Sequence, residues 1–96
     1  MPRLEVFLVT PEEEVWSGEA TMVIARGTEG EVGILAGHAP MLVRLKEGTV
    51  RIQHAGSEER ADVPGGFLHV STDDDVTRVD VLAESVSLGA DQPDAG

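Results

Sequence analysis

The stretch that decides the fold is "VTRVDVLA" (residues 76–83), in which polar and apolar side chains alternate. Successive side chains of a β-strand point to opposite faces, so this period of two predicts a half-buried strand. The residues at even positions share one side of that strand: Val76, Arg78, Asp80 and Leu82. The rest of the chain repeats this pattern in other short segments.

Outward from this stretch, similar segments are separated by turn signals. In "LEVFLVT" (residues 4–10) one face carries Leu4, Val6 and Leu8, and "TVRIQH" (residues 49–54) alternates in the same way. Turn signals recur about every 8–12 residues, the spacing typical of a β-sandwich or a small barrel. No window long enough for a helix shows a helical period. We therefore predict an all-β fold with about nine or ten short strands.

The length of 96 residues indicates a single domain. Because apolar residues become sparse beyond Glu84, we expect a β-domain over residues 1–88 and a disordered tail over residues 89–96. Aromatic residues make up only 3% of the chain. The core must therefore consist of Val, Leu, Ile and Ala side chains.

The charge and the cysteine content exclude several classes of function. A formal net charge of −11 disfavours binding to nucleic-acid phosphates or to anionic lipids, and favours a partner with a basic patch. The chain has no cysteine, which excludes disulfides, zinc–thiolate sites and thiol catalysis. Glu5 precedes any apolar run, so we expect no signal peptide. The apolar runs are far shorter than the roughly 20 residues that span a bilayer, so we expect no direct membrane insertion.

The candidate site is "TEGEVGILAGHAP" (residues 28–40), which combines glycines, two glutamates, a histidine and a proline. Its glycines lack the Lys-Ser/Thr pair and the strand-to-helix context of a phosphate-binding loop. Glycine instead permits positive φ and the close approach of another chain. The residue before Pro40 is pushed toward an extended conformation. The pattern therefore predicts a shaped surface for a partner.

Three histidines are the first candidates for chemistry, but they lie about fifteen residues apart, without a short metal-ligand spacing: His38, His54 and His69. We expect His54 to be solvated at a strand end and His69 to lie on the exposed face of its strand. His38 with Glu29 or Glu31 could form a base and its orienting partner, but no activated nucleophile lies nearby. The sequence therefore predicts neither a metal site nor catalysis.

An aspartate-rich turn and the single lysine could each be functional or simply part of the surface. The three aspartates of residues 73–75 lack the glycine and distal glutamate of a calcium loop, so we expect a solvated turn. Lys46, the only lysine, lies in the turn "LKEG", as a cofactor-bearing lysine of a carrier domain would. An acidic β-domain can also carry a single lysine without such a role.

Four segments together resemble the ε subunit of the F-type ATP synthase, specifically its N-terminal β-domain. They are, in order, "VTPEEEVWSGEA" (residues 9–20), "TEGEVGILAGHAPML" (28–42), "LKEGTVRI" (45–52) and "VPGGFLHVS…VTRVDVLAE" (63–84). Their order and spacing match the family from about residue 3 to about residue 86. Ala36 is a departure, because many members carry proline there.

The resemblance implies a flattened β-sandwich of about ten strands with a mechanical function. The subunit would dock on the γ subunit and on the membrane c-ring as part of the central stalk, or rotor. It would thereby help couple proton flow to rotary ATP synthesis, without cofactor and without catalysis of its own. It would lie peripherally at the cytoplasmic face of the cell membrane, held there by its partners. The alternative is an unrelated acidic β-domain that binds another protein.

The resemblance also assigns the interface with γ and the c-ring to six residues: Glu29, Glu31, Gly33, Gly37, His38 and Pro40. Carboxylates that face basic loops would supply register and electrostatic complementarity. Many members carry a C-terminal helical hairpin that can inhibit ATP hydrolysis and, in some, binds ATP. Residues 89–96 are too short for such a hairpin, so we expect neither property.

Overall fold

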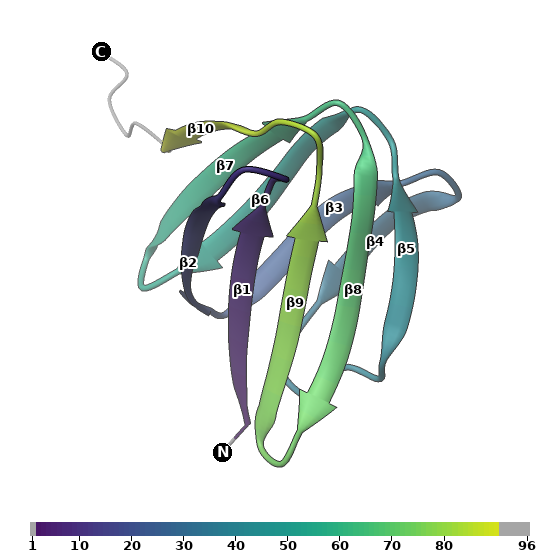
Figure 1. Ribbon diagram of the computed structural model, residues 1–96. Helices are drawn as coiled ribbons and strands as arrows, with labels where there is room; N and C mark the ends of the chain where they lie inside the picture. Colours follow the sequence, from purple (N-terminus) through teal and green to yellow (C-terminus); the bar gives the residue numbers. More distant parts are fainter. Residues whose placement is uncertain (1, 91–96) are drawn as a thin grey trace.

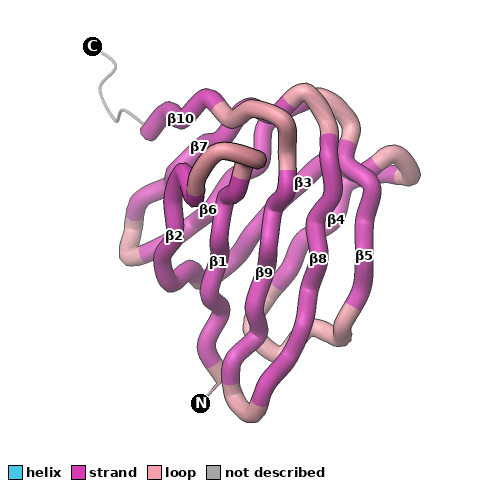
Figure 2. Tube along the Cα trace, in the orientation of Figure 1, coloured by secondary structure: helices cyan, strands magenta, loops and turns pink. Residues whose placement is uncertain are grey.

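The computed structural model describes residues 2–90, and every regular element among them is a β-strand. The ten strands are β1 (Arg3–Val9), β2 (Glu14–Ala20), β3 (Met22–Gly27), β4 (Gly30–Ile34), β5 (Met41–Leu45), β6 (Gly48–His54), β7 (Ser57–Val63), β8 (Gly66–Asp73), β9 (Val76–Leu82) and β10 (Ser87–Ala90). Short loops connect them, as Figure 2 shows. The prediction of an all-β fold with about ten strands is confirmed.

The strands form two stacked layers (Figure 1). The front layer has the order β2-β1-β9-β8-β5, and the rear layer has the order β10-β7-β6-β3-β4. The two layers are joined where β3 pairs with β5 through Gly27 and Leu45. Strands β1 and β9 run parallel, whereas the other pairs are antiparallel. The connection makes one folded-over sheet, so the predicted sandwich is confirmed.

The core lies between the layers and consists of alternate residues of the strands. In β1 the side chains of Leu4, Val6 and Leu8 are buried, as the alternation predicts. In β9 the buried positions are Val79 and Val81, so the even positions of this strand face outward. All buried hydrophobic residues described are Leu, Val, Ile or Ala, which confirms the predicted composition of the core.

The chain crosses from the rear layer to the front layer between β7 and β8. This connection consists of Pro64 and Gly65 and leads into Gly66, the first residue of β8; both glycines have positive φ, of 139° and 134°. Residues with a side chain rarely adopt these angles, whereas glycine does so at little steric cost. The Pro-Gly-Gly sequence therefore serves the crossing between layers.

The end of the domain differs in one respect from the predicted boundary at residue 88. Strand β10 includes Gly89 and Ala90, and it pairs with β7 through the backbone, from Ser87 opposite Asp62 to Ala90 opposite Glu59. Backbone pairing at a sheet edge needs no apolar side chains, so the composition of this segment does not reveal the strand. The remaining residues of the predicted tail, 91–96, lie outside the described residues.

Candidate functional site

The six predicted interface residues lie along one edge of the sandwich and do not form a compact cluster. Glu29 is in the turn between β3 and β4, whereas Gly37, His38 and Pro40 follow the other end of β4. A strand rises about 3.4 Å per residue, so the five residues of β4 separate these two groups by about 17 Å. The arrangement can contact an extended partner surface, but it cannot converge on one small ligand.

Strand β4 is an edge strand, because β3 is its only described neighbour. Glu31 and Gly33 are exposed on it, and Arg26 of β3 lies directly opposite Glu31. An edge strand leaves a row of backbone N–H and C=O groups unpaired, which suits contact with another chain. The structure therefore places Glu29, Glu31 and Gly33 where a partner can reach them.

The segment after β4 is held partly by its own hydrogen bonds. The backbone N–H of His38 donates to the carbonyl oxygen of Leu35 at 3.1 Å. The Nδ1 atom of His38 lies 2.7 Å from the carbonyl oxygen of Ala39, within hydrogen-bond distance. The His38 side chain is half-buried, whereas Gly37 and Pro40 are exposed.

Thr77 of β9 also contacts this segment, although the sequence pattern did not mark it as a site residue. Its Oγ1 atom accepts a hydrogen bond from the backbone N–H of Gly37 at 2.7 Å. Thr77 is 1% exposed and is the only buried polar residue of the described part of the chain. The sequence did contain a signal for Thr77. It is the one polar residue among the odd positions of residues 76–83, which otherwise carry Val79, Val81 and Ala83.

A groove opens between the edges of β4 and β5. It has a volume of about 540 Å³ and is lined by residues 27–32 and 41–44. At one end the backbone N–H of Thr28 donates to the carbonyl oxygen of Arg44 at 2.9 Å. The charged side chains beside the groove are the exposed Glu29, Glu31 and Arg44. Their charges are mixed and solvated, which suits a protein contact better than an enclosed ligand site.

A second exposed feature is the front-face patch, which we define as Val9, Leu42, Phe67 and Leu82. Phe67 pairs with Leu82 across β8 and β9, and Leu82 pairs with Val9 across β9 and β1, so these three side chains form a row. Leu42 lies on the same face outside the row, opposite His69. Phe67 is 43% exposed, Leu82 44% and Leu42 65%. A hollow of about 420 Å³ lies beside Phe67 and Leu82, at the end of the row near Pro11.

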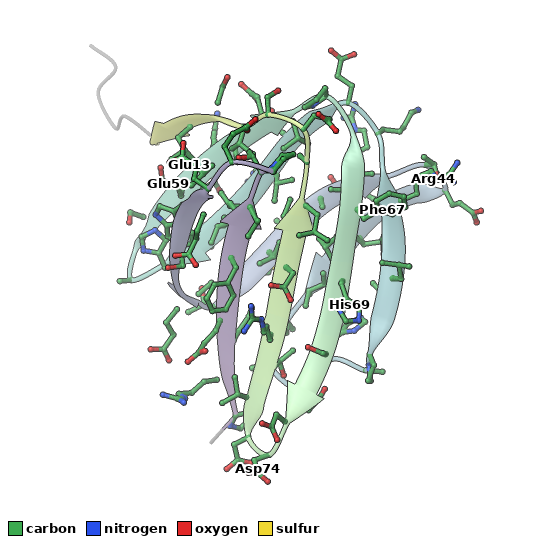
Figure 3. The ribbon with its side chains drawn as sticks, in the orientation of Figure 1. Glu13, Arg44, Glu59, Phe67, His69 and Asp74 are labelled. Carbon is green, nitrogen blue, oxygen red and sulfur yellow. The ribbon has the colours of Figure 1, made fainter. Side chains whose placement is uncertain are left out.

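The rim of the front-face patch is polar. The guanidinium carbon of Arg44 lies 6.0 Å from the centre of the Phe67 ring, and Figure 3 shows the two side chains next to each other, with His69 farther along β8. An exposed apolar patch with a polar rim is typical of a protein-binding surface. The sequence did not reveal the patch, because its members come from four different strands.

The three histidines do not converge. His69 is exposed on the front layer, as predicted. The prediction for His54 was wrong: its ring lies 5.7 Å from the ring of Trp16, and its Nε2 atom is buried without a hydrogen-bond partner. His54 does end a strand, as predicted, but its side chain is half-buried against Trp16 of β2, which a single strand pattern cannot show. Within residues 2–90, no group of three or more His, Asp or Glu side chains could hold a metal ion.

The outer face of the rear layer carries a cluster of charges around Glu58. Its carboxylate accepts hydrogen bonds from Arg51 at 3.1 and 3.2 Å, from Arg60 at 2.9 Å and from Gln53 at 3.3 Å. The bonds from Arg51 and then Arg60 are the main causes that lower the pKa of Glu58 from 4.5 to about 2. Since the partners come from both β6 and β7, this cluster links the two strands.

Glu58→Gln is expected to destabilise the domain at pH 7 by about 1 kcal/mol, because a neutral amide makes weaker hydrogen bonds to the two guanidinium groups. A lowered pKa in the folded state stabilises the domain above pH 4.5, and this contribution is lost as the pH falls from 4.5 toward 2. Urea unfolding of wild type and variant, measured between pH 7 and pH 2, tests this. Glu59→Gln is the matched control, because Glu59 makes none of these bonds. A difference that does not change with pH would contradict the role of the charge.

No helix of the described residues is long and apolar enough to cross a bilayer. Taken together, the fold and the site define a small β-sandwich that presents an open edge and an apolar face in place of an enclosed pocket. The family described as ATP synthase, Delta/Epsilon chain, beta-sandwich domain matches residues 3–89. The chain therefore belongs to this family, and the resemblance inferred from the sequence is confirmed.

Curated relatives bear the same family name. The chain is 46% identical to the ATP synthase epsilon chain of Frankia casuarinae over 86 residues, which are 88% of this chain and 96% of the relative. It is 45% identical to the epsilon chain of Brevibacillus brevis over 95% of this chain and 67% of the relative. For Thermobifida fusca the values are 49% identity, 90% of this chain and 63% of the relative. The chain thus spans nearly all of the first relative and about two thirds of the others.

Two solved structures share the fold. A chain of the Euglena gracilis mitochondrial ATP synthase, in a structure of OSCP, F1 and c-ring, matches with a TM-score of 0.80 and 26% identity, over 92% of this chain and 54% of that chain. A chain of the Tetrahymena thermophila mitochondrial ATP synthase matches with a TM-score of 0.67 and 20% identity, over 88% of this chain and 65% of that chain. As a member of this family, the chain is an ATP synthase subunit domain and is not itself catalytic.

Proposed function

We propose that this chain is a central-stalk subunit that docks on the γ subunit and the c-ring, and so helps couple proton flow to rotary ATP synthesis. It is held by these partners at the cytoplasmic face of the cell membrane and does not insert into the bilayer. The β-sandwich, predicted over residues 1–88 and extended by β10 to Ala90, supplies the docking domain. The similar Euglena gracilis chain comes from a structure that contains F1 and the c-ring, which supports this assignment.

The front-face patch is the observation that carries the proposal, and we assign it to γ. Exposed leucine and phenylalanine side chains arranged in one row lose contact with water when a partner covers them, and this burial favours association. The hollow beside Phe67 and Leu82 can receive a side chain of the partner. Apolar anchors of this kind account for most of the binding free energy of many interfaces.

The edge formed by Glu29, Glu31, Gly33, Gly37, His38 and Pro40 is assigned to the polar loops of the c-ring and the adjoining part of γ. Exposed carboxylates at this edge would attract basic loops and fix the register of the contact. The net charge of −11 acts in the same direction. The unrelated acidic β-domain considered above is no longer needed, because the family match covers residues 3–89.

A comparison of two leucines tests the assignment of the patch. Leu82 is 44% exposed within the front-face patch, and Leu88 is 42% exposed on β10, outside it. Leu82→Ala is expected to weaken binding to purified γ at least tenfold, whereas the matched control Leu88→Ala should change it less than twofold. Isothermal titration calorimetry with the full chain measures both. Equal effects of the two substitutions, or no binding of wild type to γ, would overturn the assignment.

A further inference from the structure

Thr77 occupies a position where a valine would be the ordinary choice. It lies on the inner face of β9 with Val79 and Val81, and it is as buried as they are. A hydroxyl group in an apolar core costs free energy unless it is hydrogen-bonded. Its hydrogen bond with Gly37 therefore accounts for the presence of a threonine here.

The bond joins two distant parts of the chain. Gly37 and Thr77 are 40 residues apart, and Thr77 belongs to the front layer, whereas β4, which leads to Gly37, belongs to the rear layer. The other described hydrogen bonds of Gly37 and His38 stay within the same short segment, to Leu35 and Ala39. Among the described hydrogen bonds of Gly37 and His38, the bond to Thr77 is thus the one that reaches another strand.

Ala36, the residue before Gly37, packs against the core, but Gly37 itself lies in open space. The backbone of Gly37 has a φ of 91°, and a Cβ atom added there would meet nothing within 4 Å. A glycine in open space has many accessible conformations, so it can move when its hydrogen bond is removed. The hydrogen bond from its N–H to Thr77 therefore has a large share in fixing the shape of the segment.

We propose that Thr77 is a positioning residue that holds Gly37 and His38 in the conformation that docks on the γ and c-ring assembly. This inference rests on the proposed function, because it takes these two residues as interface residues. Thr77 itself touches no partner, since it is buried. It acts through the Gly37 N–H, so its effect on binding is indirect.

The test compares Thr77→Val with the conservative Thr77→Ser in the full chain. Valine has nearly the shape of threonine but cannot accept the hydrogen bond, whereas serine can. We expect amide hydrogen exchange at Gly37, followed by NMR, to become about tenfold faster in Thr77→Val and to stay near the wild-type rate in Thr77→Ser. Amides of β6 and β7 should keep their relative protection in both variants, which separates a local change from global destabilisation.

The second readout is binding to a reconstituted complex of γ and c-ring. Thr77→Val should weaken binding several-fold and Thr77→Ser should restore it. Unchanged exchange at Gly37, or faster exchange with unchanged affinity, overturns the positioning role. If wild type does not bind the complex at all, the proposed function fails, and the docking role of Thr77 fails with it. If wild type binds and Thr77→Val binds equally well, the positioning role fails while the proposed function stands.

Discussion

Gly66→Ala is expected to destabilise the domain by about 4 kcal/mol, a large part of the stability of a domain of this size. Gly66 has a φ of 134°, which residues with a Cβ atom rarely adopt. A Cβ added there would collide with the carbonyl oxygen of Leu82 and would lie 3.2 Å from the Cα of Ala83. These are backbone atoms at the end of β9, which pairs with both β8 and β1 and cannot shift without breaking its ladder.

Urea unfolding at pH 7, followed by the fluorescence of Trp16, the single tryptophan, measures this loss. Gly89→Ala is the matched control, because an added Cβ meets nothing within 4 Å and φ is not in the positive range there. We expect that variant to unfold within about 0.5 kcal/mol of wild type. A Gly66→Ala variant with the wild-type midpoint would refute the close approach of β8 to the end of β9.

Leu68→Ala is expected to cost about 3 kcal/mol. Leu68 is fully buried in β8, opposite Val43 of β5 and Val81 of β9, in the middle of the front layer. Removing its side-chain atoms loses transfer free energy and leaves a cavity that strands paired on both sides can close only partly. Thermal and urea unfolding of wild type and variant measure the difference.

The control for Leu68→Ala is Leu42→Ala. Leu42 precedes Val43 in β5, so it points to the opposite face, and it is 65% exposed. We expect this variant to change the free energy of unfolding by less than about 0.5 kcal/mol, although Leu42 belongs to the front-face patch. Equal losses in the two variants would contradict the assignment of Leu68 to the inner face and of Leu42 to the outer face of the front layer.

Much of the fold was predictable, because it depends on local patterns. The alternation of residues 76–83 correctly separated an outward face from an inward face, and the same holds for Leu4, Val6 and Leu8 in β1. The role of the Pro-Gly-Gly sequence in carrying the chain between layers could not be read from the sequence, because it depends on how the layers stack. Strand β10 had no apolar pattern to reveal it, since it is held by backbone pairing with β7.

The candidate site was predictable only in part. The sequence drew attention to residues 28–40, and the structure places the exposed members of the predicted set along one edge of the sandwich. Their role as an interface stays a prediction. His54 was misjudged, because its burial against Trp16 results from two strands, β2 and β6, that are far apart in sequence.

The sequence by itself determined the class of fold, the composition of the core and the family, because periodicity, turn residues and motif order are local and can be read along the chain. Only the tertiary structure decided which side chains meet. It brings Val9, Leu42, Phe67 and Leu82 onto one face from four strands, and it sets Thr77 against Gly37 across the two layers. The physical reason is that strand register and layer stacking fix these contacts, and both depend on the packing of the whole domain.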